Sequence, residues 1–305
     1  MQVRPAAAHF HIYSQRNICV SVARSAFYPS PSGVVFITGA SRGIGAATAE
    51  AFARAGWRVA IAARTHDASQ ALAHQLRRPD GQLLAGSLAT TAAAVQACGA
   101  EVFAHAMDLM DSASMDAALD AVLAHFGRID LLINNAVYQD REINAMLLEL
   151  DDAALQRTLL GNVVAPFHLA RRLLPTLLAQ GSGQIINVCS GAGQSDPPIA
   201  ANQGGWGFAY GASKAGLARL AGCINREHGA QGVRAYSVNP GLVTTEAVTA
   251  TLGEDSALAQ RYGAVSPSAI AAGLLWLATD PGAVALARKP TLIQLQELVH
   301  EHQLT

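Results

Sequence analysis

The sequence is poor in charge and especially in lysine. Charged residues make up 14% of its 305 positions, and 19 of the 21 basic residues are arginine, which leaves Lys214 and Lys289 as the two lysines. The formal net charge of −1 gives no electrostatic footprint of a protein that binds phosphate backbones or anionic lipids. We therefore expect neither nucleic acid nor a membrane as a partner.

Cysteine pairs, metal-ligand spacings and long apolar runs are also missing. The four cysteines are Cys19, Cys98, Cys189 and Cys223, and their wide spacing favours neither a zinc ribbon nor a disulfide framework. The ten histidines show no metal spacing, so we expect no metal site. The longest apolar run, Ala269–Ala278, has ten residues, about half of the roughly 20 that span a bilayer. These features favour a reducing compartment and a cytoplasmic protein.

Residues 1–32 differ from the rest, because they contain three arginines, several serines and no acidic residue. Polar residues interrupt every apolar stretch, which argues against a secretory signal. The composition matches an organelle transit peptide, and a disordered extension or an over-long choice of start codon explains it equally well. We expect 1–32 to be an appendage and 33–305 to form a single domain.

From residue 33 onward, short β-branched or apolar runs alternate with longer Ala-rich and Leu-rich stretches of helical period. The expected strands are Val34–Thr38, Arg58–Ala63, Glu101–Ala106, Leu131–Asn134, Gln184–Cys189 and Val233–Asn239. The expected helices are Gly45–Ala55, Ser87–Cys98, Ser112–Phe126, Asp152–Ala179, Tyr210–His228 and Ser266–Ala278. This alternation predicts an α/β fold of the Rossmann type, a doubly wound parallel sheet with helices on both faces.

A glycine-rich segment, Thr38-Gly-Ala-Ser-Arg-Gly-Ile-Gly45, directly follows the first expected strand and leads into a helix. Glycines allow the sharp turn and the close approach of a diphosphate, and the helix start directs N–H groups at anionic oxygens. The spacing G-x-x-x-G-x-G differs from the common G-x-G-x-x-G pattern. The context nevertheless predicts a dinucleotide-binding loop.

This loop resembles the cofactor loop of the short-chain dehydrogenases/reductases, in their shorter, single-domain branch. The family's pattern continues in order with Asp108, Asn134-Asn-Ala136, Asn162, Ser190, Tyr210-x-x-x-Lys214 and Asn239-Pro-Gly241. The resemblance covers roughly residues 33 to 300. It implies an NAD(P)-dependent oxidoreductase that acts on a small alcohol or carbonyl substrate.

The resemblance also implies a set of cofactor-binding residues. They are Thr38, Gly39, Ser41, Arg42, Gly43, Ile44, Gly45, Arg64, Asp108, Leu109, Asn135, Ala136, Tyr210, Lys214, Pro240, Gly241, Val243 and Thr245. Asp108 resembles the family's adenine-contacting acid, although a helix N-cap would look the same in the sequence.

The end of the second expected strand bears on the choice between NAD and NADP. It reads Arg64-Thr65, and an acid there would bind the NAD ribose, whereas a base accommodates the 2′-phosphate of NADP. Arg42 is a second candidate, since a guanidinium can bind phosphate bidentately. The alternative is that both arginines are solvated surface charges. We expect NADP(H) to be preferred over NAD(H).

Tyr210 and Lys214 lie four residues apart and therefore on one face of a helix. A phenol alone holds its proton too tightly at neutral pH, and a neighbouring ammonium favours its ionised form. The use of a rare lysine here supports a chemical role, because arginine cannot replace a compact ammonium.

The family's catalytic set maps onto Tyr210 as acid/base, Lys214 as its partner and a ligand of the nicotinamide ribose, and Ser190 as the group that polarises the carbonyl. Asn162 would bend its helix and hold a water, and a buried structural asparagine is the alternative. Cys189 is expected to be a strand residue rather than a nucleophile.

Two departures from the family pattern concern the pocket. Val137 stands where the family usually has glycine, which predicts a different local geometry. The interval Gly191–Ala209 is longer than usual and rich in Gly, Pro and Asn, so we expect it to shape the pocket or act as a lid.

The segment Asp151–Ala179 and the helix after Tyr210 resemble the helices through which family members form dimers and tetramers. We therefore expect a homodimer or homotetramer, although a monomer's amphipathic helix looks the same. The leading function is interconversion of a secondary alcohol and a ketone, or of an alcohol and an aldehyde, with apolar alcohols as one substrate class. An NAD-dependent alcohol dehydrogenase, a 3-oxoacyl thioester reductase and a non-catalytic dinucleotide-binding regulator remain as alternatives.

Overall fold

The computed structural model describes residues 33–64, 66–67, 84–140, 142–246, 248, 263–288 and 292–304. The expected appendage, 1–32, lies outside these residues.

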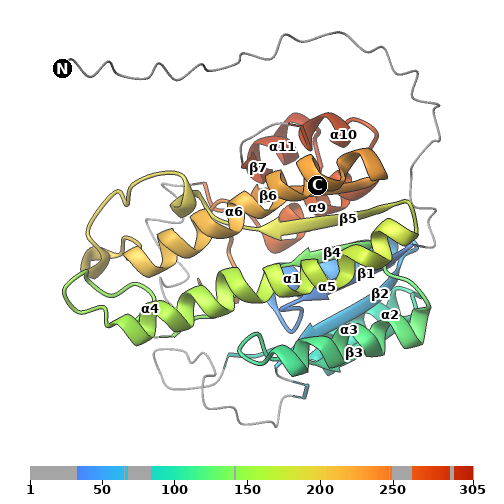
Figure 1. The fold of residues 1–305 in the computed structure, drawn as a ribbon, viewed down its shortest axis with the longest axis horizontal. Helices are drawn as coiled ribbons and strands as arrows, with labels where there is room; N and C mark the ends of the chain where they lie inside the picture. Colours follow the sequence, from blue (N-terminus) through green and yellow to red (C-terminus); the bar gives the residue numbers. More distant parts are fainter. Residues whose placement is uncertain are drawn as a thin grey trace, which may run out of the picture.

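Within the described part of the chain, seven parallel strands form one sheet in the order β3-β2-β1-β4-β5-β6-β7 (Figure 1). The strands are β1 (Val34–Thr38), β2 (Arg58–Ala63), β3 (Val102–Ala106), β4 (Leu131–Asn134), β5 (Gly183–Val188), β6 (Val233–Asn239) and β7 (Ile293–Gln294). The order reverses between β1 and β4, and open α/β sheets bind ligands outside the carboxyl ends of the strands at such a point.

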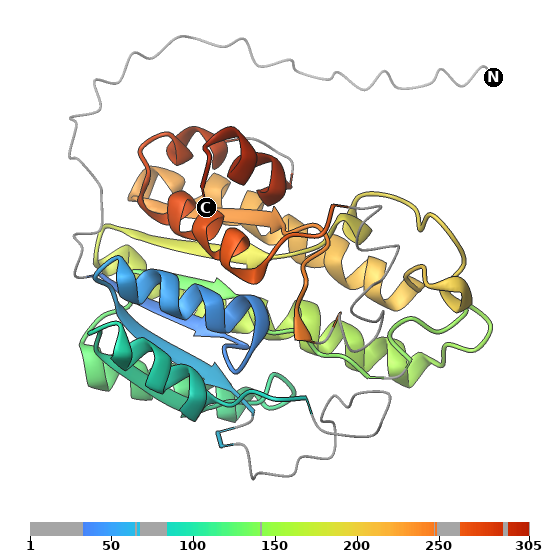
Figure 2. The ribbon, with the colours of Figure 1, turned by 180° about the vertical axis from the view of Figure 1, so that it is seen from behind.

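Helices cover both faces of the sheet, as the alternating pattern predicted (Figures 1 and 2). One apolar core includes side chains of α1 (Gly43–Arg54), α2 (Leu88–Ala97), α9 (Pro267–Thr279), α10 (Ala283–Leu286) and α11 (Leu295–Glu301). The other includes α3 (Ser112–Phe126), α5 (Ala165–Ala179) and α6 (Phe208–His228). The three-layer, doubly wound α/β fold is therefore confirmed.

Alternation along β1 shows how one strand serves both cores. Val35 and Ile37 belong to the core beneath α1, and Val34 and Phe36 belong to the opposite one. Successive side chains of a strand point to opposite faces, so a strand buried on both sides is apolar throughout.

The long helix expected over Asp152–Ala179 is not regular. It consists of α4 (Asp152–Leu159), a π-helical turn η1 at Leu160–Val164, and α5. The expectation of one continuous α-helix is wrong, because the turn around Asn162 makes i→i+5 bonds, a geometry that is frequent at functional sites. The pattern also missed the short elements β7, α10 and α11. The other bounds agree to within about two residues, the scatter usual for element ends.

Side-chain hydrogen bonds join the ends of β1 and β4 beneath the switch point. The Thr38 hydroxyl accepts from the backbone N–H groups of Asn135 (3.1 Å) and Ala136 (3.0 Å). The Asn135 amide in turn donates to the carbonyls of Thr38 (2.9 Å) and Gly39 (3.1 Å). The glycine loop and the segment after β4 are thereby held in one fixed arrangement.

Asp130 gives a test of how the sheet is held together. Its carboxylate is 6% exposed, accepts from the Val34 N–H at 2.8 Å, and pairs with Arg128. We predict that Asp130→Ala lowers the free energy of unfolding by about 1–3 kcal/mol, because it leaves a buried N–H without an acceptor.

Asp120→Ala is the matched control, since the Asp120 side chain is 64% exposed and pairs with Arg172 at the surface. Its loss should stay below about 1 kcal/mol. Urea unfolding measures both variants, and equal losses would contradict the role given to Asp130.

Candidate active site

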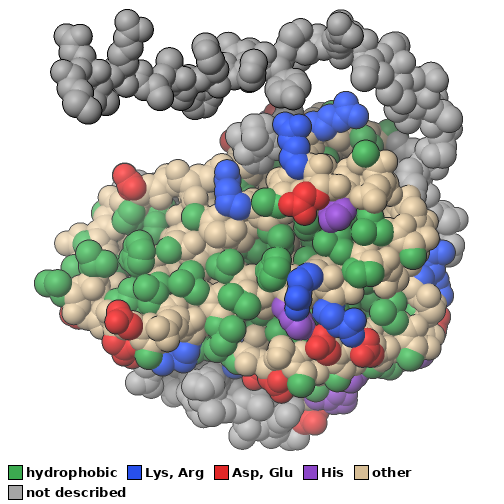
Figure 3. Space-filling view, viewed as in Figure 1, with side chains coloured by type: hydrophobic (Ala, Val, Ile, Leu, Met, Phe, Trp, Pro, Cys, Tyr) green, Lys and Arg blue, Asp and Glu red, His purple; other side chains and the backbone are tan. Residues whose placement is uncertain are grey.

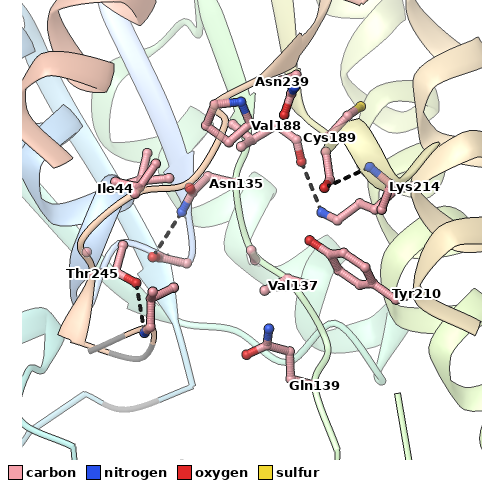
Figure 4. A pocket seen from close by; sticks show the side chains of 18 of the residues that line it. Ile44, Asn135, Val137, Gln139, Val188, Cys189, Tyr210, Lys214, Asn239 and Thr245 are labelled. Atoms are coloured by element: carbon pink, nitrogen blue, oxygen red, sulfur yellow. Dashed lines mark hydrogen bonds between the residues drawn. The ribbon is translucent and has the colours of Figure 1, made fainter. Parts of the chain in front are cut away.

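A cavity of about 880 Å³ lies at the carboxyl edge of the sheet (Figure 4). The glycine loop, the segments after β2 to β6 and part of the stretch 191–206 line it. Its volume falls in the upper part of the range of about 300–1,000 Å³ that is typical of ligand sites.

The structure brings most of the expected site residues together around this cavity. Thr38, Gly45 and Asn162 are not among the residues that line it. The expected residues that line it are Gly39, Ser41, Arg42, Gly43, Ile44, Arg64, Asp108, Leu109, Asn135, Ala136, Ser190, Tyr210, Lys214, Pro240, Gly241, Val243 and Thr245.

The glycine loop has the backbone that its sequence requires. Gly39 and Gly43 have φ angles of +68° and +56°, a region that favours glycine. A Cβ on Gly39 would also lie 2.7 Å from the Ala136 backbone. The helix α1 begins at Gly43, and its N-cap, Arg42, makes no side-chain capping bond. The first N–H groups of α1 thus lie at the cavity without a side-chain cap, as in anion-binding helix starts.

Arg42, Arg64 and Glu246 form a charged cluster at one end of the cavity. The Arg42 guanidinium donates to the Gly86 carbonyl at 3.2 Å. Burial lowers the pKa of Arg42 most, the Glu246 carboxylate raises it, and the Arg64 cation lowers it. Two cations therefore lie close together, with one acid beside them. Sequence reasoning missed Glu246, because no motif marks it and only the fold brings it next to Arg42.

Lys214 and Tyr210 project from α6 into the opposite part of the cavity (Figure 4). Lys214 is 4% exposed, its ammonium donates to the Val188 carbonyl at 3.1 Å, and it lies 5.8 Å from the centroid of the Tyr210 ring. An ammonium has three donors, and burying it with one neutral acceptor is costly. Lys214 is therefore a strong candidate for binding an oxygen-rich ligand.

Ser190 follows β5 and lines the same part of the cavity. Its Oγ accepts a hydrogen bond from the Ala192 N–H at 3.2 Å. This bond uses a lone pair of the hydroxyl and leaves its proton for an acceptor in the cavity.

Asn162 lies in the π-helical turn and links three elements. Its Oδ1 accepts from the Tyr138 N–H at 2.7 Å, and its Nδ2 donates to the Tyr138 carbonyl at 3.2 Å and to the Ser213 hydroxyl at 3.4 Å. At 2% exposure, the amide is committed to these protein partners. The geometry thus shows a structural cross-link, and a water held by Asn162 stays a prediction.

Asp108 does not cap the helix that follows it. Its Oδ1 accepts from the Met110 N–H at 2.9 Å, and the N-cap of α3 is Asp111, which accepts from the Ala113 N–H. The helix-cap alternative is therefore wrong. Adenine contact by Asp108 stays a prediction, since this residue lines the cavity.

Val137 and Gln139 line the cavity near Tyr210 (Figure 4). Among the described residues, Gln303 is the one non-glycine residue with positive φ, so Val137 has an ordinary backbone conformation. Val137 therefore adds a side chain to the cavity wall, and its backbone does not take the left-handed conformation that favours glycine. Sequence reasoning missed Gln139, because no motif marks a lone glutamine after a strand.

Cys189 follows β5 directly and is 3% exposed. Burial raises the pKa of its thiol to about 11, against the opposing effect of the nearby Lys214 cation. The thiol stays protonated at neutral pH, which agrees with a packing role and not with that of a nucleophile.

The long interval Gly191–Ala209 contributes Pro198, Ile199 and Trp206 to the cavity wall, together with the polar residues Ser195 and Asp196. It is tied to the segment after β4 by a hydrogen bond from the Gly207 N–H to the Asn144 side chain at 3.1 Å. The loop thus forms part of the cavity wall, which agrees with the expectation that it shapes the pocket. Its action as a lid stays a prediction.

No group of three or more metal-ligating side chains occurs in the part of the chain that the structure describes. In the same residues, no helix has both the length and the apolar character needed to span a bilayer.

A switch point at a glycine loop, with a Tyr/Lys pair in the opposite part of the same cavity, is typical of a dinucleotide-dependent oxidoreductase. The sequence model of the short chain dehydrogenase family matches residues 33–89 and 83–255. The chain belongs to this family and is an NAD(P)-dependent oxidoreductase.

Curated relatives and solved structures agree with this assignment. D-threitol dehydrogenase of Mycolicibacterium smegmatis is 32% identical over 82% of this chain and 87% of the relative. A 3-oxoacyl-[acyl-carrier-protein] reductase of Synechocystis is 32% identical over 82% of this chain and 90% of the relative. A short-chain type dehydrogenase/reductase from Mycobacterium marinum superposes with a TM-score of 0.69 at 25% identity, covering 86% of this chain and 93% of that one.

Proposed function

We propose that this protein is an NADP(H)-preferring oxidoreductase that interconverts a secondary alcohol and a ketone, or an alcohol and an aldehyde. The observation that carries the proposal is the buried Lys214 ammonium beside Tyr210, in a cavity whose other end holds the glycine loop with Arg42, and Arg64 from the end of β2.

The residues of the cavity fit a nicotinamide dinucleotide. The uncapped start of α1 suits the diphosphate, and the spare donors of Lys214 suit the hydroxyls of the nicotinamide ribose. Pro240, Val243 and Thr245 line the cavity and would hold the nicotinamide. When bound, the cofactor supplies or accepts the hydride.

The side chains of the chain itself manage the proton. In the reductive direction, Tyr210 donates its phenolic proton to the substrate oxygen, and in the oxidative direction it removes the alcohol proton. The Lys214 cation stabilises the phenolate that forms. Ser190 donates a hydrogen bond to the same substrate oxygen, since its Oγ already accepts from Ala192. Asn162 would support this set by holding α6 in place.

The cluster of Arg42 and Arg64 supports a preference for NADP(H). Both arginines line the cavity, and each lowers the charge repulsion that a 2′-phosphate would otherwise meet from Glu246. A phosphate is the ligand best suited to two neighbouring guanidinium groups. NAD-dependent activity is the alternative, and an acid at the end of β2 would have favoured it.

The wall near Tyr210 supports a neutral, largely apolar substrate. Pro198, Ile199 and Trp206 supply apolar surface there, and Asp196 is the acid among them. The cations among the described lining residues are Arg42, Arg64 and Lys214, all of which serve the cofactor in this proposal. A substrate carboxylate would therefore lack a cation among these lining residues, which favours a neutral substrate.

We also propose that two copies associate through the face formed by η1, α5 and the start of α6. Figure 3 shows apolar side chains gathered on this side, and Leu160, Val164, Phe167 and Phe208 are 40–55% exposed. Light scattering would test this, and a monomeric mass at working concentration would contradict it.

A non-catalytic regulator would keep such a face but would not need Lys214 beside Tyr210.

Tyr210→Phe tests the proposed chemistry. We predict a loss of turnover of about 10²–10⁴-fold, because the proton donor is removed while the ring is kept. NADPH binding, followed by fluorescence titration, should be nearly unchanged. Tyr236→Phe is the matched control, since Tyr236 is a buried tyrosine whose hydroxyl donates to the Ala283 carbonyl away from the cavity. Full activity in Tyr210→Phe would refute the mechanism.

Arg64→Asp tests the cofactor preference. We predict that the ratio of kcat/KM for NADPH to kcat/KM for NADH falls by about tenfold or more. The reason is that a carboxylate repels the 2′-phosphate of NADPH and binds the ribose hydroxyls of NADH. The exposed Arg288→Asp, outside the cavity, is the charge-reversal control. An unchanged ratio would make Arg64 a bystander.

A substrate panel followed by NADPH absorbance tests the substrate class. We predict that a neutral cyclic ketone has a kcat/KM about tenfold or more above that of the same ring bearing a carboxylate, because the acid would be buried without a cation. Asp196→Asn should narrow this gap by removing like-charge repulsion. Faster turnover of the carboxylate would contradict the proposal.

A further inference from the structure

The segment Leu84–Thr91, which leads into α2, packs against the glycine loop although it lies more than 40 residues away in sequence. Two hydrogen bonds join them. The Arg42 guanidinium donates to the Gly86 carbonyl at 3.2 Å, and the buried Thr91 hydroxyl donates to the Ala40 carbonyl at 2.8 Å. The glycine loop is therefore tethered on the side that carries Arg42.

Gly86 is the residue that makes this contact close. Its φ of +116° is strained for any other residue. A Cβ at this position would lie 2.5 Å from the Ser41 carbonyl oxygen, 2.9 Å from the Arg42 Cβ and 3.3 Å from the Arg42 Nε. The Arg42 side chain thus rests on bare backbone, and a side chain at residue 86 would displace the stem of Arg42 together with the Ser41 carbonyl that precedes it.

The segment is itself rigidly anchored. Ser87 is 1% exposed, and its Oγ accepts from the Thr90 N–H at 3.1 Å as the N-cap of α2. Thr91 is 3% exposed and follows in the first turn of the helix. The residue after Gly86 is therefore the N-cap of a helix, which anchors the Gly86 carbonyl beside Arg42.

This arrangement is unfavourable for Arg42 when judged on stability alone. Its Nε is buried and has no hydrogen-bond partner among the described residues, and a second cation, Arg64, lies nearby. An unsatisfied buried donor costs free energy, and a ligand that accepts a hydrogen bond at the cavity would remove this cost.

We propose that Gly86 and Thr91 are positioning residues that determine cofactor specificity, because they hold Arg42 in the orientation that binds the 2′-phosphate of NADP(H). The inference rests on the proposed preference for NADP(H) and extends it to residues that contact no reacting atom. One end of Arg42 is fixed by the Gly86 carbonyl, which leaves its other guanidinium nitrogen for the phosphate. Because NADH has no 2′-phosphate, loosening this tether affects NADPH more.

The test is a double-mutant cycle on the ratio of kcat/KM for NADPH to that for NADH. Arg42→Met keeps the stem and removes the guanidinium, and Gly86→Ala displaces the side chain. Each single variant should lower the ratio by about tenfold or more, the loss of a charge-assisted contact. The double variant should be no lower than Arg42→Met, because Gly86 acts through Arg42.

Gly99→Ala is the matched control for backbone strain. Gly99 has a φ of +80°, lies at the other end of α2, and has open space where a Cβ would be. The Gly99→Ala variant should leave the ratio unchanged.

The Thr91→Val variant repeats the test without backbone strain at a glycine, and we expect it to lower the ratio. Thr91→Ser, which keeps the hydroxyl, should restore the ratio.

The outcomes separate this inference from the proposed function. If Arg42→Met lowers the ratio but Gly86→Ala and Thr91→Val do not, the positioning role is refuted and the NADP(H) preference stands. If the double variant falls well below Arg42→Met, Gly86 acts by another route and the inference is also refuted. If Arg42→Met leaves the ratio unchanged, both the inference and the phosphate-binding role of Arg42 are overturned.

Discussion

The arrangement around the cavity depends on how a buried ammonium is held. Lys214 has one neutral acceptor among the described residues, the Val188 carbonyl at the end of β5, and a charge in such a place is costly unless further acceptors reach it. The position of α6 determines where this ammonium lies. Asn162 joins α6, through Ser213, to the segment after β4, and so fixes Lys214 and Tyr210 relative to the sheet.

The parallel sheet then distributes charge along the cavity. The strand ends that carry Thr38 and Arg64 place an uncapped helix start and two arginines at one end, where anionic groups bind. The ends of β4 and β5 place Val137 and Ser190 near Tyr210, beside the apolar wall from Trp206. This distribution of charge matches a ligand whose phosphates lie at one end of the cavity and whose other end reacts with a carbonyl group.

Much of this arrangement could be predicted from the sequence, because its signals are local. The period of apolar residues gave the strands and helices, the three glycines marked the loop, and the rarity of lysine pointed to Lys214. The π-helical turn could not be predicted, since it depends on bonds between Asn162 and Tyr138. Gln139, Glu246 and Gly86 were missed for the same reason, because contacts between distant segments, not motifs, place them at the site.

A bound cofactor should complete the set of hydrogen-bond partners of the buried Lys214 ammonium. A crystal structure of the complex with NADP⁺ measures this. We expect the ammonium to keep its bond to the Val188 carbonyl and to lie about 3 Å from the hydroxyls of the nicotinamide ribose, while Arg42 contacts the 2′-phosphate. A bound cofactor whose ribose makes no contact with Lys214 would contradict it.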